Sequence, residues 1–248
     1  MSANLIRRHA WFTAVTLGWI VALAPAAQAA TTGSGKPGTE AREASGFAAI
    51  TMRGDIDVVV RQGAREAVQV STDDNLLPLL QTVVEGSGDQ RSLRIQWKAG
   101  ESVRAKSRTV VTVDVVKLTA VALSGSGDLA LGALKTPSLA LSISGSSDAK
   151  VEQLDAGQLT VSISGSGDVQ ASGKATKVEI SIAGSGDVRT RELAAEDVSV
   201  SIAGSGDASV NASKALSVSI AGSGDVEYTG GATLAKARVA GSGSVRQR

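Results

Sequence analysis

The chain has 248 residues, and its 25 basic and 24 acidic residues nearly cancel, which argues against a strongly basic nucleic-acid binder. It has no cysteine, which excludes disulfides, thiol nucleophiles and cysteine-ligated zinc sites. Only 2% of the residues are aromatic, so an aromatic platform for stacking bases or sugars is not expected, and the core must be aliphatic.

Residues 1–29 have the three parts of a secretory signal peptide. A pair of arginines precedes 15 apolar residues at 10–24, and a small-x-small motif follows. The apolar run is shorter than the roughly 18–20 residues that span a bilayer. We therefore expect cleavage between Ala29 and Ala30, export to the periplasm, cell surface or extracellular space, and no integral membrane segment in the mature chain.

Cleavage would also change the chemistry available to the protein. The single histidine, His9, would be lost with two of the 25 basic residues, leaving 23 basic and 24 acidic residues and a net charge of −1. Without histidine and cysteine, a Ser-His-Asp triad and the usual zinc sites are excluded. Composition thus predicts a protein that is not an enzyme and that needs no cofactor.

The first part of the mature chain lacks the apolar pattern with a 3.6-residue period that predicts an amphipathic helix. Residues 30–45 are small, polar and aperiodic, which predicts a flexible leader. Residues 46–117 contain short runs of alternating aliphatic residues, typical of strands, and a short apolar turn interrupted by Pro78. We expect an irregular N-terminal β lobe at 46–117.

From residue 118 to residue 248 the sequence repeats a Gly-Ser-Gly-Asp marker about seven times. Successive copies are 18–20 residues apart, and Ser244 replaces the aspartate in the last copy. An alternating strand precedes each marker and a shorter strand follows it. A fixed period of this length predicts a β-solenoid whose strands pair in parallel with the next coil, continuous with the N-terminal lobe. One column of its core should contain Ile163, Ile182, Ile202 and Ile220.

The marker glycines are expected to be structural. A Gly-x-Gly pair at the end of a strand suits a tight turn, whereas a phosphate-binding loop would need a following helix. The predicted turn glycines are Gly125, Gly127, Gly165, Gly167, Gly184, Gly186, Gly204, Gly206, Gly222 and Gly224.

The marker aspartates should form a column along the solenoid, with about 4.8 Å between rungs. Each carboxylate could cap a backbone N–H in its own turn, which is common behaviour for aspartate in turns. Two alternatives are a calcium ladder and general acid/base catalysis on sugars, although calcium needs six or more oxygens and catalysis needs two different carboxylates. The residues concerned are Asp128, Asp148, Asp168, Asp187, Asp207 and Asp225.

Two further features concern the surface. The outward positions before each marker are mostly serine and alanine, which predicts a flat band that is either a solvated face or a docking surface for a glycan, a partner sheet or another copy. The last repeat carries Lys236, Arg238, Arg246 and Arg248, and because charges of this kind blunt an exposed sheet edge, they predict an end cap rather than a binding patch.

The repeated SISGSGDV and SIAGSGDV turns, the opening ITMRGDIDVVVRQG and the NLLPLLQTVVEG…LRIQW stretch resemble the head GIN domain family. The resemblance runs from about Phe47 to the C-terminus. It implies an all-β, right-handed parallel β-helix-like solenoid with an adhesin-like binding or structural role in the cell envelope and no catalytic residues. The partner would be an envelope protein or a glycan, or a second copy in a homo-oligomer. The alternatives are a polysaccharide-active enzyme on a β-helix scaffold and a calcium-stabilised surface repeat protein.

Overall fold

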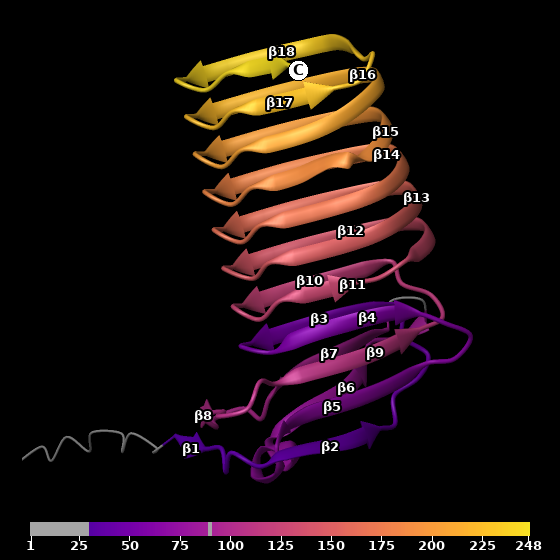
Figure 1. Ribbon diagram of the computed structural model, residues 1–248, viewed down its shortest axis with the longest axis vertical. Helices are drawn as coiled ribbons and strands as arrows, with labels where there is room; N and C mark the ends of the chain where they lie inside the picture. Colours follow the sequence, from indigo (N-terminus) through magenta and orange to yellow (C-terminus); the bar gives the residue numbers. More distant parts are fainter. Residues whose placement is uncertain (1–29, 89–90) are drawn as a thin grey trace, which may run out of the picture.

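A computed structural model describes residues 30–88 and 91–248 of the chain. These residues form an all-β solenoid in which the strands of successive rungs pair in parallel (Figure 1). A rung is one strand, the tight turn after it and the strand that leaves that turn. The predicted signal segment at 1–29 lies outside the described residues, of which Ala30 is the first.

The repeats build the upper part of the stack. Each long strand starts after one Gly-Ser-Gly-Asp turn, bends at a corner and ends at the first glycine of the next turn. The strands are β10 (Ala120–Gly125), β11 (Leu129–Leu131), β12 (Leu134–Gly145), β13 (Ala149–Gly165), β14 (Val169–Gly184), β15 (Val188–Gly204), β16 (Ala208–Gly222), β17 (Val226–Thr229), β18 (Thr233–Gly241) and β19 (Val245–Gln247).

A rung from the N-terminal part of the chain continues this stack in register. Strands β3 (Ala49–Gly54) and β4 (Asp57–Gln62) pair in parallel with β10 and β11, and Gly54 aligns with Gly125. Beneath them, β7 (Ser92–Trp97) and β9 (Val110–Val115) pair in parallel with β3 and β4. The region 46–117 is therefore less irregular than its sequence indicates, because its alternating aliphatic residues face the same core as the repeats.

Antiparallel strands close the lower end of the stack (Figure 1). Strand β5 (Ala67–Asp73) lies between β9 and β2 (Pro37–Arg42), and β6 (Leu80–Glu85) pairs with β7. A short 3₁₀ helix, η1 (Asp74–Leu79), contains Pro78 and joins β5 to β6. None of the described residues forms a helix that is long and apolar enough to cross a membrane.

The expected flexible leader is instead part of this lower end. Besides β2, the two-residue strand β1 (Thr31–Thr32) pairs with β8 (Val103–Arg104). The buried carboxylate of Asp73 holds the segment, since it accepts hydrogen bonds from the N–H of Gly35 at 2.9 Å and from the N–H of Lys106 at 2.7 Å. Composition cannot show this anchor, because its residues are more than 30 positions apart.

The core is one continuous aliphatic cluster that extends from Phe47 to Tyr228. Inward residues of neighbouring rungs align in columns, as the period-two alternation predicts. The isoleucine column is confirmed, since its members are at most 2% exposed and pair in register between successive strands: Ile163, Ile182, Ile202 and Ile220. Stacking of like side chains therefore replaces the aromatic packing that the composition lacks.

Candidate functional site

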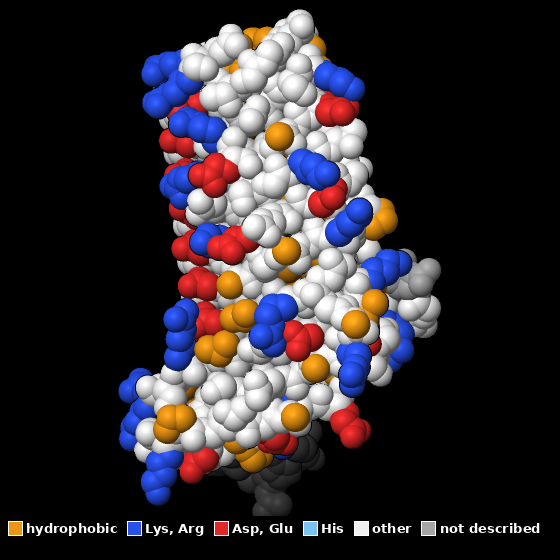
Figure 2. All heavy atoms as spheres, turned by 45° about the vertical axis from the view of Figure 1, so that its right-hand side comes forward, with side chains coloured by type: hydrophobic (Ala, Val, Ile, Leu, Met, Phe, Trp, Pro, Cys, Tyr) orange, Lys and Arg blue, Asp and Glu red, His pale blue; other side chains and the backbone are white. Residues whose placement is uncertain are grey.

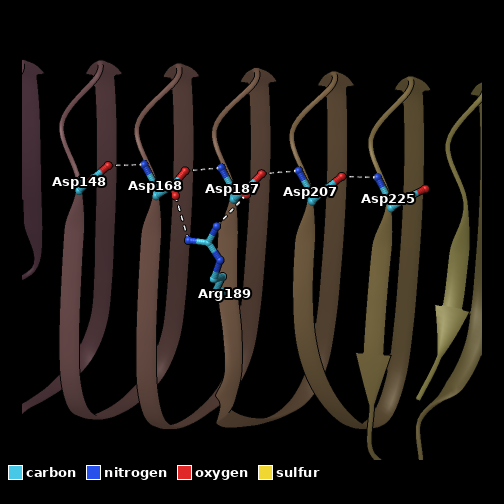
Figure 3. A network of polar contacts seen from close by, with 6 residues as sticks. All are labelled: Asp148, Asp168, Asp187, Arg189, Asp207 and Asp225. Atoms are coloured by element: carbon cyan, nitrogen blue, oxygen red, sulfur yellow. Dashed lines mark hydrogen bonds and ion pairs between the residues drawn. The ribbon is translucent and has the colours of Figure 1, made fainter.

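The aspartates of the repeat turns form one column along the edge of the solenoid (Figure 3). The column begins one rung earlier than the repeats indicate, at Asp57, the first residue of β4 after the turn that follows β3. The sequence held a signal for this residue, because Gly54 and Asp57 have the same Gly-x-x-Asp spacing as Gly125 and Asp128. The Gly-Ser-Gly part of the marker is absent there, which is why the repeat pattern misses it.

Each carboxylate binds the backbone of the next rung. Oδ1 of every column aspartate accepts the backbone N–H of the following column residue. The donor–acceptor distances, in chain order, are 3.0 Å for Asp128 to Asp57, 3.2 Å for Asp148 to Asp128, 2.9 Å for Asp168 to Asp148, 2.9 Å for Asp187 to Asp168, 2.9 Å for Asp207 to Asp187, 2.7 Å for Asp225 to Asp207 and 2.7 Å for Ser244 to Asp225. The bonds therefore form between rungs, which differs from the expected cap within each turn.

The backbone explains why this acceptor has to come from a side chain. The carbonyl of Asp168 accepts the N–H of Ala149, which belongs to the preceding rung. The N–H of Asp168 also faces that preceding rung, where Asp148 offers its carboxylate. The carbonyl and the N–H of Asp168 therefore both point toward the preceding rung, at the turn where the chain passes from one face of the solenoid to the other. The carboxylate supplies the acceptor that the backbone ladder lacks there.

The last rung ends this ladder with a different residue. Ser244 donates both its N–H and its hydroxyl to Oδ1 of Asp225, at 2.7 and 2.8 Å. These bonds, and the nearby charge of Arg246, lower the pKa of Asp225. Serine thus stands at the position that aspartate holds in the earlier rungs, and Asp225 is the last carboxylate acceptor among the described residues.

Arginines pair with the second carboxylate oxygens at two places. Arg189 bridges two rungs, since its guanidinium donates to Oδ2 of Asp168 and to Oδ2 of Asp187, each at 2.9 Å (Figure 3). The hydrogen bond with Asp168 raises the pKa of Arg189 above its ordinary value. Arg108 pairs in the same way with Oδ2 of Asp57. Neither arginine stood out in the sequence, because each lies outside the marker.

The arrangement does not gather ligands for a metal ion. Within residues 30–88 and 91–248, no group of three or more His, Cys, Asp or Glu side chains is placed to hold one. Each column aspartate uses Oδ1 in the ladder, which leaves one oxygen per rung. Two grooves, of about 550 and 520 Å³, run beside the column; they share Gln170 and Arg189 and have both acidic and basic walls.

The marker glycines differ in what they provide. Gly165, the first glycine of its turn, has a φ of +137°, a backbone conformation that residues other than glycine rarely adopt. Gly167, the second, has no such φ, but a Cβ there would overlap the carbonyl oxygen of Ser147 in the preceding rung. The same pair of constraints recurs at Gly184 and Gly186, and in the following turns.

One turn departs from this pattern. Ser147 stands where the other markers have their second glycine, and its side chain is fully buried. Among the residues that the structure describes, its hydroxyl has no hydrogen-bond partner. The pattern of the other turns predicts glycine at this position.

The outward band of small residues lies on the face that leads into the turns. Its residues align from rung to rung, in two rows. The first row is Ser142, Ser162, Ser181, Ser201 and Ser219, and the second is Ser144, Ser164, Ala183, Ala203 and Ala221. Ser199 and Ser217 are paired neighbours beside the first row. All are exposed except the half-buried Ser217.

Comparison with known proteins gives a family and a fold. The family described as "Putative auto-transporter adhesin, head GIN domain" matches residues 46–232. No curated protein matches the chain in sequence.

Several solved structures share the fold. An adhesin, described as putative, from Bacteroides fragilis is 23% identical with a TM-score of 0.79, over 88% of this chain and 100% of that one. Two Parabacteroides distasonis proteins, described as a putative lipid binding protein and a putative adhesin, are 25% and 26% identical. Each has a TM-score of 0.71 over 89% of this chain and 100% of its own.

Proposed function

The chain belongs to the head GIN domain family, and from this premise we propose that it is an exported, non-catalytic, adhesin-like binding or structural module of the cell envelope. The observation that carries the proposal is the in-register stack. Outward positions on both sides of the turns align from rung to rung, so the protein presents long, regular faces on a rod with one continuous core. Such faces suit contact with an extended partner, for which an envelope protein or a glycan is the candidate class.

The aspartate column supports the non-catalytic part of the proposal. A glycosidase needs two carboxylates in different environments, one as acid and one as base or nucleophile. Here the carboxylates of Asp148, Asp168 and Asp207 make the same bond to the same backbone group. A hydrogen bond that completes the fold gives each of them a structural role.

Export is supported by the sequence of residues 1–29 and by the family. Sequencing the N-terminus of protein recovered from a periplasmic or surface fraction tests it, and a mature start at Ala30 is expected. Recovery of the protein in the cytoplasm with Met1 or Ser2 at its N-terminus would contradict export.

Binding and catalysis can be tested on the same sample. Purified protein is incubated with envelope fragments and with isolated envelope glycans, and both retention and newly formed reducing ends are measured. We expect retention without release of sugars, and loss of retention after either protease or periodate treatment identifies a protein or a glycan as the partner. Release of reducing ends that stops in an Asp168→Asn/Asp187→Asn variant would support the polysaccharide-active enzyme instead.

A further inference from the structure

The upper end of the solenoid is an open sheet edge (Figure 1). Strand β18 pairs with β16, and β19 pairs with β17. Across the described ranges, these are the pairings with a register for β18 and β19, and the other edge of each strand is free of a paired strand. The opposite end differs, because the antiparallel strands β2, β5 and β6 close it.

The inner columns of the core end uncovered at this edge. Leu234 and Val239 align with Leu216 and Ile220, which are at most 2% exposed one rung below. In the last rung the exposed fractions rise to 39% for Leu234 and 43% for Val239. Apolar side chains are visible at this end in Figure 2. An additional strand would cover them as every other rung covers its neighbour.

Several outward positions of the last rung are basic. Lys236 and Arg238 align with Ser217 and Ser219 of the rung below, so cations replace the small side chains of the band. On the other face, Arg246 aligns with Glu227. Basic side chains gather beside the upper end in Figure 2. Because outward side chains of adjacent strands stand about 4.8 Å apart, an added strand would place its own side chains next to these cations.

These charges select between two occupants. A second copy that met this end through its own β18 would bring Lys236 and Arg238 near their counterparts, and like charges on neighbouring strands destabilise pairing. A second copy stacked in register would add a further rung. The backbone N–H of its turn would find no aspartate acceptor in the rung below, because Ser244 stands there. A strand with acidic side chains at alternate positions meets neither obstacle.

We propose that β18 binds an extended acidic segment of a partner protein, which adds a strand to the open end of the solenoid. Acidic side chains of the segment lie beside Lys236 and Arg238, and the aliphatic residues between them cover Leu234 and Val239. Backbone hydrogen bonds to the free edge of β18 provide affinity. The inference stands apart from the proposed function, since it holds whether or not the protein is exported.

A peptide titration tests the proposal. A blocked, fluorescein-labelled octapeptide of alternating Glu and Val is titrated with purified protein, and fluorescence anisotropy gives Kd. An octapeptide of alternating Lys and Val is the comparison. We expect the Glu-Val peptide to bind and the Lys-Val peptide to bind at least tenfold more weakly. Lys236→Glu/Arg238→Glu should weaken the Glu-Val peptide roughly tenfold or more, because two attractive pairs become repulsive.

A matched variant separates edge binding from general attraction. Lys174→Glu/Lys177→Glu makes the same change of charge on β14, in the middle of the stack, and should leave the Kd unchanged. Thermal melts establish that both variants are folded. Equal weakening in both variants, or no binding of the Glu-Val peptide to the wild-type protein, would overturn the proposal. So would a dimer in sedimentation that Val239→Glu abolishes, because the occupant would then be a second copy.

Discussion

The backbone N–H of Asp225 donates to Oδ1 of Asp207, one rung earlier, over 2.7 Å. This bond recurs along the column and joins each turn to the next. It makes the aspartate a part of the sheet's hydrogen bonding, although its side chain stands at the solvent-exposed edge of the solenoid. The carboxylate is needed as an acceptor, and its charge is not needed for that bond.

Replacement of Asp207 should therefore depend on the acceptor. Asp207→Asn keeps an oxygen that can accept the N–H of Asp225 and should change the free energy of unfolding by less than about 0.5 kcal/mol. Asp207→Ala removes the acceptor and should cost about 0.5–1.5 kcal/mol. Urea unfolding of both variants measures the difference. Glu192→Ala, at an exposed carboxylate on β15 outside the column, controls for loss of charge, and equal losses in the Asn and Ala variants would contradict the ladder.

The isoleucine column gives a test of which strand face points inward. Ile202 is buried, and its neighbour Ser201 is exposed on the outward band. Ile202→Ala should cost about 2–5 kcal/mol in the free energy of unfolding, because it leaves a cavity in a close-packed stack. Ser201→Ala should stay within about 0.5 kcal/mol. Comparable losses in the two urea melts would mean that the assignment of faces is incorrect.

The turn at Ser147 should be improved by glycine. Ser147→Gly removes a buried hydroxyl without a partner, which costs about 1–3 kcal/mol when left unsatisfied, while the added glycine costs about 0.4–1 kcal/mol in backbone entropy. A net gain of about 1 kcal/mol is expected. Ser146→Gly is the matched control, because Ser146 is exposed in the same turn and its loss adds only the entropy cost. A thermal melt in which both variants lose stability would contradict this account of Ser147.

Acid should loosen the lower end of the solenoid through Asp73. Burial opposes ionisation of this carboxyl, but hydrogen bonds from the side chain of Ser107 and from the backbone of Lys106, Ser107 and Gly35 lower its pKa below the ordinary 3.8. A lowered pKa in the folded protein means that the carboxylate stabilises the fold above about pH 3.8. That stabilisation is lost as the pH falls below this value and through the lower folded pKa.

The pH dependence of urea unfolding between pH 6 and pH 2 measures this effect. The wild-type midpoint should fall more steeply below pH 3.8 than that of Asp73→Asn, which has no carboxyl to protonate at this position. The reference is Asp74→Asn, since Asp74 is the exposed neighbour in η1. Parallel curves for the wild type and Asp73→Asn would show that Asp73 does not anchor the leader.

The sequence predicts the parts of this fold that depend on local period. Alternating aliphatic residues and a marker every 18–20 residues are enough to assign the solenoid, its inward columns and its turns. Contacts between distant segments leave no such pattern, and the anchoring of Gly35 by Asp73 spans 38 residues. For the same reason, the sequence predicts a column of aspartates but not that each carboxylate bonds to the next rung, nor that Arg189 bridges two of them. The bonding depends on which way the backbone N–H of each turn points.

The ladder also determines how the column should respond to calcium. Ca²⁺ needs six to eight oxygen ligands, but each column aspartate keeps Oδ1 in the ladder, and Arg189 takes the second oxygens of Asp168 and Asp187. Millimolar calcium should therefore leave the Tm of the wild-type protein equal to its Tm in chelator. The Asp207→Asn variant, measured in the same two buffers, is the control for binding at the column. A calcium-dependent rise in Tm that disappears in this variant would show by mass action that calcium binds the folded state, and the aspartate column would then be a metal ladder.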